Sequence, residues 1–126
     1  MLRQRQPRVK DKKHKGYVAQ LPCVICGTVG VHVAHVRYPD AEERASHTGM
    51  AQKPDDWRVV PLCPRHHLHG PEAQHSMGEE EFWQENGINP YTLAKALFAA
   101  KGDVPFMVQL VLKARTLFPA RYISLI

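Results

Sequence analysis

The sequence predicts an α+β fold in which two short strands come first and helices follow. Runs of β-branched residues before residue 63 predict the strands, and apolar residues at helical intervals after residue 78 predict the helices. A chain of 126 residues has room for one small domain with a modest core, and such domains often need an additional link to stay folded. Cysteines and histidines in two separate clusters are the candidates for that link.

The first half of the chain is expected to contain a short helix, two strands and a long loop. We expect the helix at residues 15–21, the strands at residues 31–36 and 58–62, and the loop at residues 38–53, where charges are frequent and large apolar residues are few. Pro61 indicates that the second strand lies at a sheet edge or ends there.

The second half of the chain is expected to be helical. A short helix begins at about residue 64 and is interrupted by Gly70-Pro71. Three longer helices follow, at residues 79–86, 90–100 and 104–118, and their apolar stripes are most simply core. The sequence thus divides into a basic flexible arm, a core and a helical extension packed on the core, at residues 1–14, 15–85 and 86–126.

The cysteine and histidine clusters have the spacing of a structural zinc site. Cys23 and Cys26 form a Cys-x-x-Cys pair, while Cys63 and His66 form a Cys-x-x-His pair. A two-residue gap lets a tight turn present both side chains to one ion, and zinc takes four such ligands. The alternatives are ordinary buried cysteines or a redox pair, but a redox motif is expected at a helix start among parallel strands, whereas glycines follow Cys26. We therefore expect these four residues to hold a structural Zn²⁺.

Composition and charge narrow the class of protein. Three cysteines are an odd number for a disulfide framework, and no signal peptide pattern or long apolar run is present, so we expect a cytoplasmic protein without membrane contact. The net charge is +5, and the excess is concentrated in the first fifteen residues, where seven basic residues accompany Asp11. Such an arm is attracted to phosphate backbones, although solvated tails can have the same composition.

Two strands followed by a helix, with a metal site that joins their bases, is the ββα-metal architecture. The chain resembles the HNH nucleases, in particular the phage and prophage group that includes the RecA-dependent recombination-enhancement nuclease. The resemblance covers roughly residues 15 to 98 and implies an HNH or treble-clef-like core with additional C-terminal helices. It rests on Leu21-Pro22-Cys23-Val-Ile-Cys26-Gly27, Ala34-His35-Val36-Arg37, Gly49-Met50-Ala-Gln-Lys53-Pro54-Asp55-Asp56-Trp57, Val60-Pro61-Leu62-Cys63-Pro-Arg-His66-His67, and Gln74-His75 before Phe82-Trp83.

The resemblance implies a metal-dependent endonuclease that hydrolyses DNA phosphodiester bonds. This reaction needs a base to activate water and a divalent cation to offset charge on the phosphate and the leaving 3′ oxygen. His35 matches the position of the base, and an unperturbed imidazole can accept a proton at cellular pH. The alternative is that His35 belongs to the core or to the surroundings of the zinc.

The resemblance also implies ligands for a catalytic Mg²⁺, Mn²⁺ or Zn²⁺. His67 matches the first ligand and His75 the second, while His69 competes for the second role. A ligand three or four residues after His67 on the same helix would be Gly70 or Pro71, and neither can serve. We therefore expect the second ligand to come from a turn, and His75 is favoured.

Two positions depart from the family pattern. Many members carry a ligand immediately before the base, where this chain has Ala34. Either His32 is the missing ligand, or the site uses fewer protein ligands and more water. The middle Asn of the motif is also absent, and the nearest polar residues are Asp56 and Asp55. A carboxylate there can accept a hydrogen bond from the imidazole N–H of the base, as the family residue orients it. Alternatively, both aspartates are turn formers after Pro54.

The hypothesis that the resemblance favours is an HNH-type endonuclease with His35 and Asp56 at its catalytic centre. Neighbouring cationic side chains are candidates for holding the DNA backbone, namely Arg37, Lys53 and Arg65, with Arg58 close by. A rival hypothesis is a noncatalytic zinc-stabilised module that binds nucleic acid, and Ala34 favours it. A further rival is an adaptor that contacts a recombination or packaging protein through its C-terminal helices. The oligomeric state stays open.

Overall fold

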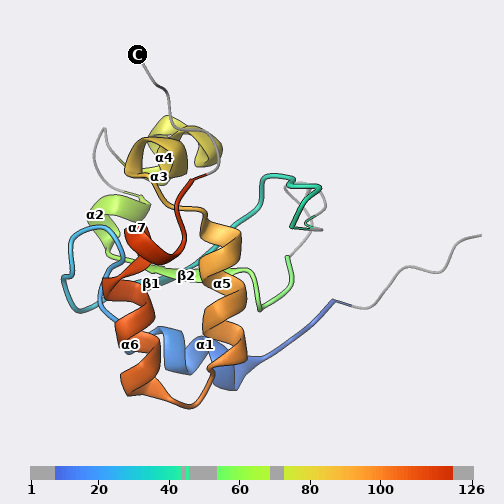
Figure 1. Ribbon diagram of the computed structural model, residues 1–126, viewed down its shortest axis with the longest axis vertical. Helices are drawn as coiled ribbons and strands as arrows, with labels where there is room; N and C mark the ends of the chain where they lie inside the picture. Colours follow the sequence, from blue (N-terminus) through green and yellow to red (C-terminus); the bar gives the residue numbers. More distant parts are fainter. Residues whose placement is uncertain (1–7, 44, 46–53, 69–72, 121–126) are drawn as a thin grey trace, which may run out of the picture.

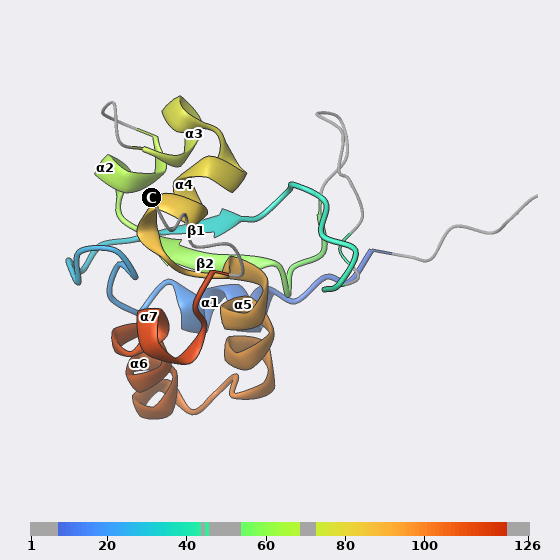
Figure 2. The ribbon, with the colours of Figure 1, turned by 45° about the horizontal axis from the view of Figure 1, so that its top comes forward.

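The computed structural model describes residues 8–43, 45, 54–68 and 73–120 (Figure 1). Two antiparallel strands lie between helices on either side, so the described part of the chain is α+β, as the sequence predicts (Figure 2). The strands are β1 (His32–His35) and β2 (Val59–Leu62). The helices are α1 (Lys12–Val18), α2 (Pro64–His67), α3 (Gln74–Met77), α4 (Glu79–Asn86), α5 (Pro90–Ala99), α6 (Val104–Leu112) and α7 (Ala114–Leu117). None of the described helices combines the length and apolarity needed to cross a bilayer.

The hairpin positions the residues that the sequence analysis singled out. His32 pairs with Leu62 at one end, and His35 pairs with Val59 at the other. Because side chains alternate along a strand, His32 and Ala34 share one face of β1 while His35 points to the opposite face. Helix α2 contacts both strands, whereas α1 and α5 contact β2. All four residues of β2 are buried, so the hairpin is the middle layer of the molecule (Figure 2).

Pro61 is tolerated within β2 because the sheet has two strands. Each described strand is therefore an edge strand, as Pro61 indicated, and a missing backbone N–H need not break a ladder on both sides. The carbonyl of Pro61 still accepts a hydrogen bond of 3.1 Å from the backbone N–H of Val24. The proline thus joins β2 to the first cysteine turn.

Helix α1 begins earlier than expected, at Lys12 instead of residue 15. The reason is Asp11, whose side chain accepts a 2.9 Å hydrogen bond from the backbone N–H of His14 and caps the helix. Residues 8–11 are also hydrogen bonded to the segment at 54–56. The expected flexible arm of residues 1–14 is therefore wrong from residue 8 onward, and residues 1–7 lie outside the described part.

The C-terminal helices follow their sequence signals except at one break. Helix α4 ends as expected at Gly87, whose φ of 71° suits glycine, and Asn89 caps α5. The single helix expected over 104–118 is wrong, because Lys113 leaves the helical conformation and separates α6 from α7. The break lets the chain return, since the carbonyl of Phe118 accepts a 2.8 Å hydrogen bond from the backbone N–H of Asn89.

One core joins residues from both sides of residue 86. Trp83 is 1% exposed, as expected for a packing residue, and its indole N–H donates to the Gln74 side chain at 2.9 Å. That bond ties α4 to α3, a helix where the sequence predicted a turn. The same core cluster contains apolar side chains of the hairpin and of the helical extension, among them Val59, Leu62, Leu93, Leu97 and Met107.

His14 is a fully buried polar residue of α1. Its ring packs edge-on against Phe98 of α5, with 5.0 Å between ring centroids. Neither ring nitrogen has a hydrogen-bond partner among the described residues. Burial, as the largest influence, lowers the pKa of His14 below its ordinary value of 6.5, so the ring is neutral in the folded protein at pH 7.

The buried ring predicts acid sensitivity that His14→Leu should remove. In the unfolded chain, His14 binds a proton below about pH 6.5, whereas in the folded chain it binds a proton only at a lower pH. Stability is therefore lost as pH falls from 6.5 to the pKa of His14 in the folded protein. Relative to the wild type, the His14→Leu variant should gain up to about 1.4 kcal/mol of unfolding free energy per pH unit in that window. Urea unfolding between pH 7.5 and 5.5 measures this. A stability difference that does not vary with pH would contradict the assignment.

Candidate functional site

Two tight turns present the four predicted zinc ligands. Cys23 and Cys26 lie in the turn after α1, where the backbone N–H of Gly27 donates to the carbonyl of Cys23 at 2.8 Å. Gly27 has a φ of 79°, a conformation that favours glycine. In the second turn, Cys63 follows β2 directly and its carbonyl accepts the N–H of His66 at 3.0 Å. Each two-residue spacing therefore closes as expected.

The four ligand atoms form one cluster, all within 4.8 Å of one another. The sulfurs of Cys26 and Cys63 are 3.7 Å apart, and Nδ1 of His66 lies 3.3 Å from the sulfur of Cys63 and 3.9 Å from that of Cys23. A tetrahedral zinc site requires about 3.8 Å between sulfurs and about 3.6 Å between sulfur and nitrogen, whereas a disulfide requires about 2 Å. No cysteine is in a disulfide. The geometry therefore fits a structural zinc site.

The Cys3His cluster lies near the two ends of helix α2, through Cys63 and His66. This helix has four residues, Pro64–His67, and so short a helix is not stable by itself. Since Cys63 and His66 are tied to the first turn, α2 is held against the hairpin. His67 then lies on the side of α2 that meets β1.

His67 contacts His32 of β1. Their Nδ1 atoms are 3.0 Å apart, and the rings meet edge-to-face at 5.2 Å. Two imidazole nitrogens bound to one cation at right angles would be about 3 Å apart. This distance is therefore compatible with two histidines that bind one cation, and equally with a direct hydrogen bond between the two rings. His32, the alternative ligand, is thus the residue brought to His67, while His69 and the His75 side chain lie outside the described part.

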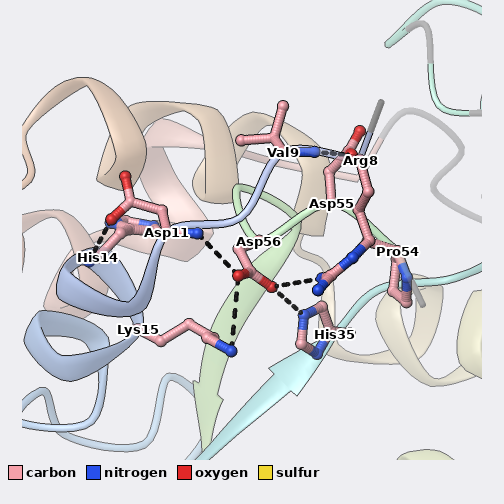
Figure 3. Close-up of polar contacts among 9 residues, drawn as sticks. All are labelled: Arg8, Val9, Asp11, His14, Lys15, His35, Pro54, Asp55 and Asp56. Atoms are coloured by element: carbon pink, nitrogen blue, oxygen red, sulfur yellow. Dashed lines mark hydrogen bonds and ion pairs between the residues drawn. The ribbon is translucent and has the colours of Figure 1, made fainter. Parts of the chain in front are cut away.

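His35 contacts Asp56 at the other end of β1 (Figure 3). Nε2 of His35 lies 3.1 Å from Oδ1 of Asp56, a residue that is buried and 1% exposed. The same oxygen receives Nη1 of Arg8 at 3.1 Å, while Oδ2 receives the backbone N–H of Asp11 at 2.8 Å and faces Nζ of Lys15 at 3.5 Å. Asp56 is thus the common partner of three segments of the chain.

Asp56 is ionised at neutral pH. Burial raises the pKa of its carboxyl, but the N–H of Asp11, the His35 ring and the charges of Lys15 and Arg8 together outweigh burial and lower it to about 2. An ionised carboxylate only accepts hydrogen bonds, so Nε2 of His35 carries the proton and Nδ1 keeps its lone pair. The tautomer of His35 is therefore defined by Asp56.

His35 is neutral at pH 7. Burial lowers its pKa below 6.5, and the charges of Lys15 and Arg37 act in the same direction. The hydrogen bond and charge of Asp56 raise the pKa but do not reverse the shift. The ring is 25% exposed, so solvent reaches it. His35 is therefore a neutral imidazole with one nitrogen able to accept a proton.

Of the predicted site residues, His32 and His67 form one pair and His35 and Asp56 form another, while the expected contribution of His75 lies outside the described side chains. His32 and His35 point to opposite faces of β1 and lie about 10 Å apart along the strand. The His32–His67 pair lies next to His66 of the cysteine cluster, whereas the His35–Asp56 pair lies beside the segment that precedes α1.

The predicted DNA-contacting residues have different surroundings. Arg65 is exposed on α2, and the backbone N–H of Arg37 donates to both carboxylate oxygens of Glu79 at 2.9 and 3.0 Å. Lys53 lies outside the described residues. Arg58 is wrong as a candidate, because it is 3% exposed and its guanidinium donates to the carbonyl of Val36 and the hydroxyl of Tyr91.

Sequence reasoning did not single out Arg8 and Lys15. Both were part of the basic arm, and Arg8 lies 48 positions from the carboxylate that it contacts. Charge alone does not reveal such a long-range contact.

Comparison of the chain with protein-family models, with curated proteins and with solved structures found no match. A functional proposal therefore depends on the chemistry of the described residues.

The zinc assignment predicts different effects for two adjacent histidines. His66→Asn should lose tightly bound zinc and unfold at a lower temperature, because one of four ligands is removed. His67→Asn, a control on the same helix, should keep one zinc per chain and the wild-type far-ultraviolet circular dichroism. Elemental analysis after dialysis against a weak chelator measures the zinc. Retention of tight zinc by His66→Asn would exclude this ligand set.

The position of Asp56 predicts a stability effect that depends on pH. Its pKa falls from 3.8 to about 2 on folding, so Asp56→Asn should lose about 2 kcal/mol of unfolding free energy at pH 7. This contribution is complete above pH 3.8 and disappears as pH falls toward 2. Asp55→Asn is the matched control, since Asp55 accepts one backbone N–H, from Val9. Urea unfolding at pH 7 should show a smaller loss for Asp55→Asn, and equal losses would contradict the role of Asp56.

Proposed function

We propose that the chain is a metal-dependent HNH-type endonuclease that hydrolyses DNA phosphodiester bonds. The observation that carries the proposal is the His35–Asp56 pair, in which a buried carboxylate orients a neutral, solvent-accessible imidazole. A hairpin followed by a helix and a Cys3His cluster supports the same reading. The motifs that resemble the HNH family provide the reaction class.

In the proposed reaction, His35 acts as the general base. Nδ1 accepts a proton from water while the water oxygen bonds to phosphorus and the bond to the 3′ oxygen breaks, and the 3′ oxygen takes up a proton from solvent to leave as a hydroxyl. The imidazolium that forms is stabilised by the ionised carboxylate of Asp56, which also keeps the ring in one orientation. A divalent cation, for which His67 with His32 or His75 would supply imidazole ligands, would offset charge on the phosphate.

One observation favours a second candidate function. The two histidine pairs face opposite sides of β1, so a cation at His32 and His67 is not beside His35. A zinc-stabilised module that binds nucleic acid without cleaving it needs no such proximity. In this second candidate, Asp56 joins the segment before α1 to the hairpin and His35 is one of its structural partners.

The two candidates predict different results with supercoiled plasmid and single-stranded DNA. If the chain is an endonuclease, the protein with Mg²⁺, Mn²⁺ or Zn²⁺ should nick the plasmid. His35→Asn should slow nicking about a hundredfold or more, since a general base contributes that much to the rate. Activity of the wild type should persist at pH 6.5 and fall only at lower pH, because burial lowers the pKa of His35 below its ordinary value.

Two controls separate catalysis from folding. His35→Asn should keep the zinc content and melting temperature of the wild type, and His67→Asn should weaken the response to the added cation without removing the structural zinc. DNA binding without nicking under all three cations would favour the noncatalytic module. Nicking at an unchanged rate by His35→Asn would show that His35 is not the base.

A further inference from the structure

Cationic side chains from two segments converge on one buried carboxylate beside His35. Arg8 precedes α1, Lys15 lies on α1, and both contact Asp56, as does the ring of His35 (Figure 3). Arg8 also donates to the carbonyl of Pro54 at 3.1 Å. The two cations and the candidate base are thereby held at one place, although 27 positions separate Arg8 from His35 in the chain.

The cluster keeps a positive charge at neutral pH. Asp56 contributes one negative charge against the two positive charges of Arg8 and Lys15. Of the neighbouring acids, Asp11 pairs with Lys101 at 2.6 Å, whereas Asp55, which accepts the backbone N–H of Val9 at 2.7 Å, adds a second carboxylate to this surface. Residues 8–15 also include Lys10, Lys12 and Lys13. An anion that approaches His35 therefore meets a basic surface.

The side chains of Arg8 and Lys15 are partly exposed to solvent, whereas the carboxylate of Asp56 is buried. The side chains of Arg8 and Lys15 are 27% and 34% exposed, whereas that of Asp56 is 2% exposed. Arg8 makes its two described contacts through Nη1, and a guanidinium has donors on Nε and Nη2 as well. Lys15 faces Asp56 with one ammonium group that carries three donors. Both side chains can therefore contact Asp56 and a solvent-borne anion together.

We propose that Arg8 and Lys15 form a phosphate-binding site that places a nucleic-acid backbone beside His35. The ligand is a phosphodiester, and for that ligand class the proposal rests on the proposed function. Asp56 holds both cations in position before the ligand arrives, so less side-chain freedom is lost on binding. Arginine binds phosphate through paired N–H donors, and lysine adds a point charge. The segment at 8–15 is thus part of the nucleic-acid interface.

Fluorescence anisotropy with a labelled twenty-nucleotide single strand, and with its duplex, tests the site at several KCl concentrations. Arg8→Gln and Lys15→Gln should each weaken binding about tenfold at low salt and reduce the slope of log affinity against log salt by about one. Lys13→Gln removes the same charge from an exposed position on α1 and is the matched control. It should weaken binding about twofold.

A second variant separates loss of phosphate binding from loss of stability, which is needed because Arg8 and Lys15 also contact Asp56. Arg8→Lys keeps the positive charge, so it should keep the wild-type salt slope and melting temperature while it loses affinity several-fold. If Arg8→Gln and Lys15→Gln bind like Lys13→Gln, or if the wild type binds neither nucleic acid, the phosphate site is overturned. Binding that depends on Arg8 and Lys15 without any plasmid nicking would support the site and reject the endonuclease.

Discussion

The junction of two cysteine turns is the constraint on which the rest of the fold depends. A two-stranded hairpin and a four-residue helix bury too little surface to hold their arrangement alone. Four ligand atoms within 4.8 Å, from turns some forty residues apart, fix the end of β2 against the turn after α1. Because β2 is buried on both faces, α1, α2 and α5 then pack against a strand whose position is already set.

A second junction, at Asp56, is electrostatic. It joins the segment before α1, helix α1 and the end of β1 through one carboxylate. Burying that charge is unfavourable unless donors surround it, and four donors do so here. The consequence is a site that contains an ionised carboxylate, a neutral imidazole and two partly exposed cationic side chains. Both proposals for nucleic acid derive from this arrangement.

The sequence predicted those features that short-range rules control. Cys-x-x-Cys and Cys-x-x-His spacing predicted the metal cluster, because each pair depends on a single turn. Asn86-Gly87 predicted the end of α4 for a similar reason. The break at Lys113 was not predictable, since it depends on the pairing of Phe118 with Asn89. Likewise, nothing local distinguishes Arg58, which is buried, from Arg65, which is exposed. The pairing of His67 with His32 depends on how α2 is placed by the metal cluster.

Arg58 joins the hairpin to the C-terminal helices. Its guanidinium donates to the carbonyl of Val36, directly after β1, and to the hydroxyl of Tyr91, and its charge lies 5.2 Å from the centre of that ring. The Tyr91 hydroxyl in turn donates to the carbonyl of Tyr38. The backbone that leaves β1 is thereby anchored to α5, which belongs to the C-terminal extension. A shortened chain that ends at residue 85 would leave a buried guanidinium without its phenol partner, so the C-terminal helices are integral to the frame that supports His35.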